Sequence, residues 1–218
     1  YLKTFPNEKE TAEVKFRYAV LLMNRKEQLK AYPAVSEAVA SIDSTHPRFK
    51  EALKLKIQSI EMATKDERKQ IDDRDLLASY DLYAKNFSDE ELGIEAKFKA
   101  ANLAKELEAP EQTAARFRAI AEAHPKHNLA KASLSEALAV LVKAQKWEAL
   151  GNESRALAEK TEIQSSLLEG DAEMKKKIAE ARELSMVKIS ENLEAEGKLE
   201  EAKSHYEKML SENPSETM

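Results

Sequence analysis

Three histidines are the residues whose type and spacing come nearest to a metal site. His46 and His124 each precede a proline, in the segments S-T-H-P and E-A-H-P, and His127 follows His124 by three residues. Nearby imidazoles can bind zinc, but Pro125 lies between His124 and His127 and breaks the helical geometry that would direct both rings to one ion. No carboxylate lies beside them at a standard metal-ligand spacing. We therefore interpret the histidines as helix-end residues, which the negative end of the helix dipole favours.

Three aspartates form the second group that could bind a cation. Asp72 and Asp73 lie near the end of the charged run Lys65–Arg74, and Asp75 follows directly after it. A calcium-binding loop also needs a glycine and a bidentate glutamate at fixed later positions, and this sequence supplies neither. The pattern instead favours N-capping of a helix that contains Leu76, with the charged run as a solvated turn between two helices.

The sequence gives no pattern typical of catalysis. The four glycines, Gly93, Gly151, Gly170 and Gly197, are isolated, so none belongs to a phosphate-binding loop. No serine or threonine lies in a nucleophile elbow. Among 40 acidic residues many pairs are close by chance, which gives no pair an acid–base role. We expect no catalytic residue, no metal, no cofactor and no enzymatic activity.

The composition is that of a helical protein without a basic surface. The 218 residues are 42% hydrophobic and 34% charged, and they include four glycines and six prolines. The abundant Ala, Leu, Glu and Lys are strong helix formers. The formal net charge is −5, whereas proteins that bind a phosphate backbone carry basic patches. The partner is therefore expected to be a protein or peptide, and not a nucleic acid.

Other global features limit the environment only in part. The absence of cysteine excludes disulfides and thiolate metal sites but fits both the cytoplasm and a bacterial periplasm or envelope. The apolar runs Tyr18–Met23 and Ala137–Val142 are far shorter than the roughly 20 residues of a membrane-spanning helix, so no span is expected. Because the sequence begins with Tyr-Leu-Lys and contains no leader pattern, we expect it to be a piece of a longer protein.

The segment Met186–Pro214 has small, apolar and helix-breaking residues at the spacings of one tetratricopeptide (TPR) helical hairpin. The matching positions are Met186, Ile189, Ser190, Leu193, Ala202, Tyr206 and Pro214. The chain resembles the TPR family in this segment and, less closely, in Glu91–Pro125. Met186, Ser190 and Leu193 stand where the family often has Trp, Gly and Tyr. The irregular repeats are similar in style to those of bacterial envelope, secretion and motility scaffold proteins.

The resemblance implies an all-α fold, a right-handed α-solenoid of about five antiparallel TPR-like helical hairpins in a single array over residues 1–218. Prolines after helices, at 47, 125 and 214, are 78 (125 − 47) and 89 (214 − 125) residues apart, where two repeats need about 68. The array is therefore irregular. The expected hairpins cover residues 7–47, 48–88, 89–125, 128–162 and 171–214, with an insertion at 161–170.

Several element boundaries follow from local signals. The first hairpin is expected to contain helices at 8–30 and 33–44, with Pro33 in the first turn of the second. Capping boxes are expected at Asn7 with Glu10 and at Ser88 with Glu91. The remaining expectations are a helix start at Pro110, Trp147 in the gap between two helices, and a helix of about 26 residues from Asp171 to Glu196.

The resemblance also implies a groove lined by the first helix of each hairpin, which could bind an extended peptide. Aligning the hairpins places in it Val20, Asn24, Lys65, Arg68, Phe98, Asn102 and Lys105. The carboxylate clamp of TPR co-chaperones has lysine where this chain has Val20 and Phe98, so capture of a chaperone C-terminus is not expected. A merely solvated groove is the simpler interpretation of these residues.

Two functions fit these observations. The first is a protein-binding scaffold or adaptor that binds its partner in the groove. The alternative is a structural subunit of a multiprotein secretion, motility or envelope complex, which contacts its neighbours by edges and ends. The last hairpin has no polar capping helix after it, so Leu199, Met209 and Leu210 are expected to be exposed and available for self-association.

Overall fold

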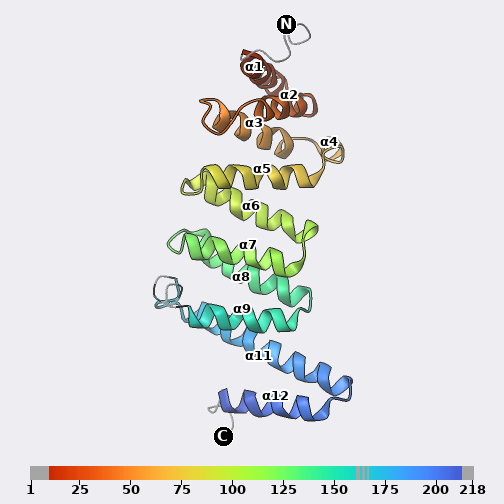
Figure 1. Cartoon of the computed structure of the whole chain (residues 1–218), viewed down its shortest axis with the longest axis vertical. Coiled ribbons are helices and arrows are strands. Elements are labelled where there is room, and N and C mark those ends of the chain that lie inside the picture. Colours follow the sequence, from red (N-terminus) through yellow and green to blue (C-terminus); the bar gives the residue numbers. More distant parts are fainter. Residues whose placement is uncertain (1–9, 161–162, 164, 166, 213–218) are drawn as a thin grey trace. The chain divides into compact units, whose positions relative to one another are not determined.

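The computed structural model describes residues 10–160, 163, 165 and 167–212, and there the chain forms eleven α-helices and no β-strand (Figure 1). The expected all-α class is confirmed. The helices are α1 Glu10–Asn24, α2 Gln28–Ala40, α3 Phe49–Glu61, α4 Lys65–Arg68, α5 Asp73–Asn86, α6 Glu91–Leu107, α7 Pro110–Ala123, α8 Leu129–Lys143, α9 Trp147–Glu159, α11 Ala172–Ala195 and α12 Leu199–Glu212.

The chain divides into two compact units, Tyr1–Leu103 and Ala104–Met218, and the boundary lies within α6. In the first unit α1 packs on α2 and α3, α2 packs on α3, and α3 packs on α5. In the second unit α7 packs on α8, α8 on α9, and α11 on α8, α9 and α12. Helices that follow one another thus pack together within each unit. That the two units form a single array stays a prediction.

Three connections between helices share one backbone turn. Their middle residues have left-handed φ angles: Lys26 at 59°, Gln145 at 55° and Gly197 at 76°. In each turn the middle N–H donates to a carbonyl three residues back, and the next N–H donates to a carbonyl five residues back. This is the Schellman motif, which ends a helix and reverses the chain. The chain therefore repeats one helix–turn–helix geometry at sites of different sequence.

The first of these turns corrects the predicted boundaries of the first hairpin. Helix α1 ends at Asn24 rather than near residue 30, because Lys26 adopts the left-handed conformation without being a glycine. Helix α2 consequently begins at Gln28, and Pro33 lies inside it rather than in its first turn. Because proline has no N–H, one backbone hydrogen bond of α2 is lost at Pro33. The Pro33 side chain is exposed.

The connections that lead into α3, α6 and α8 share a second backbone pattern. In each connection two successive N–H groups donate to the carbonyl three residues back. The three series of residues are Asp43–His46–Phe49, Phe87–Glu90–Gly93 and His124–His127–Ala130, in each of which the later residue donates to the earlier one. The last residue of each series lies buried in the first turn of the new helix. Phe49 and Gly93 are 44 residues apart (93 − 49), and Gly93 and Ala130 are 37 apart (130 − 93).

The longer of these two intervals contains the short helix α4. The charged run that starts at Lys65 was predicted to be a plain turn, but its first residues form this one-turn helix. Thr64 caps it by accepting the Glu67 N–H, while the Thr64 N–H donates to the Glu67 carboxylate at 2.9 Å. A reciprocal pair of this kind stabilises a helix start.

Gly93 sets the path of the chain from α5 into α6. A Cβ atom at this position would overlap the Phe87 carbonyl oxygen, which is backbone and cannot rotate away. The predicted capping box of Ser88 and Glu91 is wrong here, since α6 begins only at Glu91 and the Ser88 hydroxyl donates to Asp89 at 3.0 Å. Close backbone contact, rather than a side-chain cap, determines this turn.

The second unit confirms the predicted long helix. Helix α11 has 24 residues, about 36 Å at 1.5 Å per residue, and Asp171 caps it by accepting the Met174 N–H at 2.9 Å. The insertion before it contributes three buried residues, Ile163, Leu167 and Leu168. The predicted Asn7 cap and the helix-ending Pro214 lie outside the described residues.

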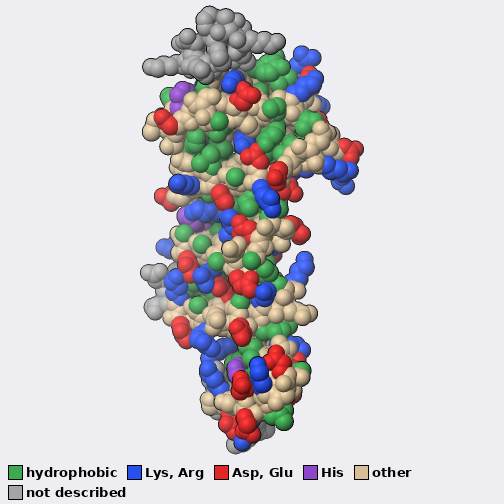
Figure 2. Space-filling model, turned by 45° about the vertical axis from the view of Figure 1, so that its right-hand side comes forward, with side chains coloured by type: hydrophobic (Ala, Val, Ile, Leu, Met, Phe, Trp, Pro, Cys, Tyr) green, Lys and Arg blue, Asp and Glu red, His purple; other side chains and the backbone are tan. Residues whose placement is uncertain are grey.

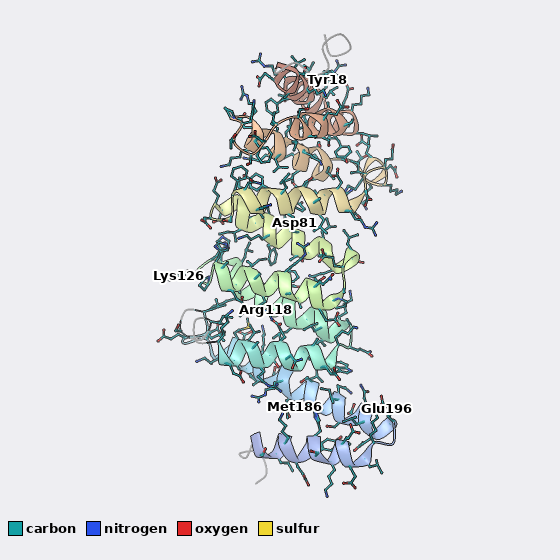
Figure 3. All side chains as sticks on the ribbon, in the orientation of Figure 1. Tyr18, Asp81, Arg118, Lys126, Met186 and Glu196 are labelled. Carbon is teal, nitrogen blue, oxygen red and sulfur yellow. The ribbon has the colours of Figure 1, made fainter. Side chains whose placement is uncertain are left out.

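The residues of α11 and α12 that were matched to the TPR pattern differ in burial. Met186, labelled in Figure 3, and Ser190 are buried on α11. Ala202 on α12 is 2% exposed, and Ile189, Leu193 and Tyr206 are half-buried. Leu199 and Leu210 are 66% and 59% exposed, as expected for an uncovered helix. The Met209 side chain lies outside the described part of the structure.

Replacing Gly93 by alanine should destabilise the protein strongly. The added methyl group meets the Phe87 carbonyl, so the start of α6 must shift, and we expect a loss of about 3 kcal/mol or more in the free energy of unfolding. Denaturant unfolding measures this loss. Gly151→Ala is the control, because its methyl group would meet the Ser185 hydroxyl, a side chain that can rotate. Equal losses in both variants would contradict the assigned turn.

The register of α12 can be tested with two neighbouring residues. Ala202→Glu places a carboxylate in a buried contact and should cost on the order of 1 to 3 kcal/mol or more, with a clear drop in melting temperature. Lys203→Glu changes an exposed residue and should have little effect. Thermal unfolding by circular dichroism measures both. Similar melting temperatures for the two variants would show that this register is incorrect.

Candidate partner-binding surface

The histidines take part in turns. The Nδ1 atom of His46 accepts the Arg48 N–H at 3.1 Å, and Nδ1 of His127 accepts the Leu129 N–H at 3.2 Å. Each imidazole thus binds a backbone donor at the start of the next helix, α3 or α8, which leaves that nitrogen occupied. Among the described residues no three side chains of the metal-binding types lie close enough to share an ion.

The three aspartates have separate structural partners. Asp72 is the N-cap of α5 and accepts the Arg74 N–H at 2.9 Å, as predicted. Asp73 pairs with Arg68. Asp75 pairs with Lys56 on α3 at 2.9 Å and accepts the hydroxyl of Tyr32 on α2. Burial of Tyr32 and this bond to a carboxylate raise the tyrosine pKa to about 12.

The residues predicted to line a groove lie on three helices. Val20 and Asn24 belong to α1, Lys65 and Arg68 to α4, and Phe98, Asn102 and Lys105 to α6. Asn24 is the last residue of α1 and Lys65 the first of α4, whereas Asn102 is within α6, so these positions are not equivalent in the structure. The aligned set therefore does not form one ladder along corresponding helices.

The described contacts of this set are mainly structural. Arg68 donates to the Ile71 carbonyl at 3.1 Å, which holds the loop between α4 and α5. Asn102 donates to the Phe98 carbonyl at 2.9 Å, one turn back on α6. Lys105, which belongs to the second unit, pairs with Glu136 at 2.6 Å. That these residues bind a partner stays a prediction.

The first unit contains a different cavity, between α3 and α6 with α5 as its floor. We call it the α3–α6 cavity; it has a volume of about 140 Å³. Apolar and aromatic side chains meet charged ones in its wall. The lining residues are Lys54, Ile57, Gln58 and Glu61 from α3, Tyr80 and Tyr83 from α5, and Leu92, Glu95, Ala96 and Lys99 from α6. Of the predicted groove residues, none lies in this wall.

Glu61 organises one end of the α3–α6 cavity. Its Oε1 atom accepts the Tyr80 hydroxyl at 2.6 Å and the Lys99 ammonium at 2.7 Å. The same ammonium lies 5.9 Å from the centre of the Tyr80 ring, within range of a cation–π interaction. Burial and the Glu61 carboxylate raise the pKa of Tyr80 well above its usual value, so the tyrosine stays a neutral hydrogen-bond donor.

Other polar groups of this cavity have no partner within the described residues. The Tyr83 hydroxyl is buried, makes no hydrogen bond there, and burial raises its pKa. Lys54 and Glu95 face the cavity from α3 and α6 and form no ion pair in the described part of the chain. Leu92, at the edge of the cavity, is 41% exposed. An apolar edge beside unpaired polar groups is what a protein ligand can recognise.

The second unit has a longer depression between α8 and α11, which we call the α8–α11 groove. It consists of two cavities of about 320 and 220 Å³ that share Ser135 and Lys177. The larger cavity is mostly apolar, with Leu138 and Val142 on α8 facing Leu184 on α11. At the other end Lys131 pairs with Asp171 at 2.6 Å.

Sequence reasoning missed the residues of both depressions, although α6 carried a usable signal. Leu92, Glu95 and Lys99 recur at helical spacing beside the small residue Ala96. The alignment relied on Phe98 instead, which lies at a different angle around the helix. Leu92 is the large apolar residue beside the charged Glu95 and Lys99, and it marks the face of α6 that lines the cavity.

Glu153 is a buried acid on α9 that could suggest a catalytic role. Burial raises the pKa of Glu153, Arg118 lowers it, and the nearby Glu122 carboxylate raises it further. Arg118, labelled on α7 in Figure 3, pairs with Glu153 at 2.6 Å. Lys160 pairs with Glu122 at 2.8 Å. None of these four residues lines the α3–α6 cavity or the α8–α11 groove. The Arg118–Glu153 ion pair links α7 to α9.

Comparison of the sequence with models of known protein families gives no match, and a search of characterised proteins gives no significant match. None of the described helices has both the length and the hydropathy needed to cross a bilayer. On the face of the molecule seen in Figure 2, acidic and basic side chains are interspersed.

The buried charge of Glu153 should make stability depend on pH. The pKa of Glu153 is raised in the folded state. The protonated side chain therefore contributes its whole share of the free energy of unfolding below the usual glutamate pKa, and this share is lost as the pH rises through the raised pKa. Glu153→Gln removes this dependence, so its stability relative to the wild type should be higher at about pH 8 than at about pH 4. Chemical denaturation at both pH values measures the difference.

Glu159→Gln, on the exposed side of the same helix, is the matched control and should show a smaller change between the two pH values. A Glu153→Gln variant whose relative stability falls as the pH rises would contradict the direction of the pKa shift.

Proposed function

We propose that this chain is a non-catalytic scaffold or adaptor, a right-handed α-solenoid of about five TPR-like hairpins that binds a partner protein in grooves between helices. In this assignment α1, α3, α6, α8 and α11 are the first helices of their hairpins. The resemblance of Met186–Pro214 to the TPR pattern supports it, as do the two backbone turns that recur between helices of unrelated sequence.

One observation carries the proposal. The α3–α6 cavity and the α8–α11 groove each lie between the first helices of consecutive hairpins, although they belong to different units. In a TPR-like array this is the surface that remains open after each hairpin has buried its apolar face against its neighbours. Partner binding at such grooves needs no cofactor.

The chemistry of the grooves favours a protein or peptide as the partner. Both depressions combine leucine side chains with charges of both signs, including Lys54 and Glu95 in the first unit and Lys177 and Glu180 in the second. An amphipathic segment could place apolar side chains in the depression and polar ones at its edges. A nucleic acid would require a basic stripe, and the lining residues are of mixed sign.

A second function, a structural subunit that contacts neighbours by its ends, is favoured by α12. Leu199 and Leu210 are large apolar side chains that are mostly exposed on this helix. Such side chains are often covered in an assembly. This proposal places the contact at α12 and leaves the grooves solvated.

The two functions can be separated by photo-crosslinking in the cells that produce the protein. The crosslinking amino acid p-benzoylphenylalanine is introduced at Leu92, in the α3–α6 cavity, or at Leu210 on α12. Leu82 on α5 is the control, since it is 36% exposed but lies outside the cavity. The scaffold proposal expects a discrete partner at Leu92 and none at Leu82.

The captured partner is then purified, and its affinity is measured by calorimetry. Leu92→Glu should weaken binding about tenfold or more, because it places a charge in an apolar contact, while Leu82→Glu should leave it unchanged. Equal affinities for the two variants would exclude this cavity. A crosslink at Leu210 alone would favour the structural-subunit function instead.

A further inference from the structure

The second unit contains a third cavity, at the end of the α9 and α11 helices, whose volume is about 580 Å³. It shares no lining residue with the α8–α11 groove. Trp147, at the start of α9, faces Ile189 and Leu193 of α11 across it. This volume is within the usual range of ligand-binding pockets. We call it the Trp147 cavity.

The aromatic wall of the cavity is accessible from solvent. Trp147 is half-buried, as are Ile189 and Leu193, so the indole is held by packing while part of it remains exposed. From the sequence, Trp147 is expected to fill the gap between two helices. Its place in the wall of an open cavity leaves part of the ring available to a ligand.

The charges around Trp147 are unequal. Five charged residues line the cavity, three acidic and two basic. Lys146 pairs with Glu111 at 3.1 Å, and Lys198 pairs at 2.7 Å with Glu196, which is labelled in Figure 3. Both lysines are therefore neutralised by carboxylates of the same wall. Glu148, next to Trp147, forms no ion pair within the described residues.

We propose that the Trp147 cavity binds an arginine side chain of a partner protein. The guanidinium group would stack on the indole and pair with the unmatched Glu148 carboxylate, and the aliphatic part of the arginine would contact Ile189 and Leu193. Tryptophan is the aromatic residue that attracts cations most strongly. Further hydrogen-bond acceptors are the amide oxygens of Gln145, Asn152 and Asn192.

Arginine fits this wall better than the other charged side chains do. Its guanidinium is planar, so it can lie flat on the indole and present two N–H groups to one carboxylate, which the compact ammonium of lysine cannot do. An acidic side chain would be repelled by Glu148. The Glu148 carboxylate therefore favours a cation, and the flat Trp147 indole favours the planar guanidinium of arginine.

The proposal can be tested directly, because Trp147 is the only tryptophan in the chain and its fluorescence reports on this cavity alone. The intact protein is titrated with the blocked peptide acetyl-Gly-Arg-Gly-amide and with the same peptide containing Lys, Glu or citrulline in place of Arg. We expect a saturable change in Trp147 emission with the arginine peptide. The lysine peptide should bind several-fold more weakly, and the other two should give no saturable change.

Glu148→Gln should weaken arginine binding about threefold to tenfold, the effect of one partly exposed charge pair. Glu159→Gln on the same helix is the matched control and should leave binding unchanged, since it does not line the cavity. Circular dichroism confirms that both variants are folded. Saturation by the glutamate or citrulline peptide, no saturation by arginine, or equal affinities for the two variants would each overturn the proposal.

This site does not depend on the grooves of the proposed scaffold. Leu92→Glu, in the other unit, should leave the fluorescence titration unchanged, and Glu148→Gln should leave partner binding at the α3–α6 cavity unchanged. The failure of one proposal is therefore distinguishable from the failure of the other.

Discussion

Close contact between helices is the constraint on which each unit depends. Small side chains occupy the most buried positions, among them Ala19, Ala31, Ala52, Ala101, Ala104, Ala121, Ala130 and Ala137. Buried serines serve the same purpose: the hydroxyls of Ser59, Ser79, Ser185 and Ser190 donate to carbonyls of their own helices at 2.6–3.0 Å. A hydroxyl satisfied in this way adds little volume and needs no partner from the opposing helix. At these four serines the neighbouring backbones can therefore approach closely while the hydroxyl stays hydrogen-bonded.

Contacts between the larger side chains then link the helices at their polar edges. Lys56, Lys99 and Lys105 each lie over an aromatic ring and also pair with a carboxylate on another helix. The aliphatic part of the lysine covers the ring, while the ammonium group stays near water. In the α3–α6 cavity this arrangement, centred on Lys99, fixes one end of the wall. The packing that stabilises the hairpins therefore also shapes the candidate binding surface.

Periodicity predicted the parts of this structure that depend on local sequence. Pro110 begins α7 and Asp171 caps α11 as expected, because helix-start signals and caps act within a few turns. The end of α1 was missed because Lys26 adopts a left-handed conformation that sequence patterns assign to glycine. The cavities were missed because each is lined by side chains from at least two helices, and the sequence does not show how these helices are rotated toward each other. On α6 an error of one residue, Phe98 instead of Lys99, selects a different face of the helix.

The length of α11 affects how the second unit folds. In a helical repeat protein each hairpin contributes its own stability and exchanges interface energy only with its neighbours, so hairpins can in principle unfold one after another from an end. Helix α11 contacts α8, α9 and α12. One continuous helix makes both sets of contacts, and its sequence contains neither glycine nor proline between Ala172 and Ala195. No helix end therefore separates the contacts with α8 and α9 from those with α12. Because α11 contacts α8, α9 and α12, we expect these four helices to unfold together.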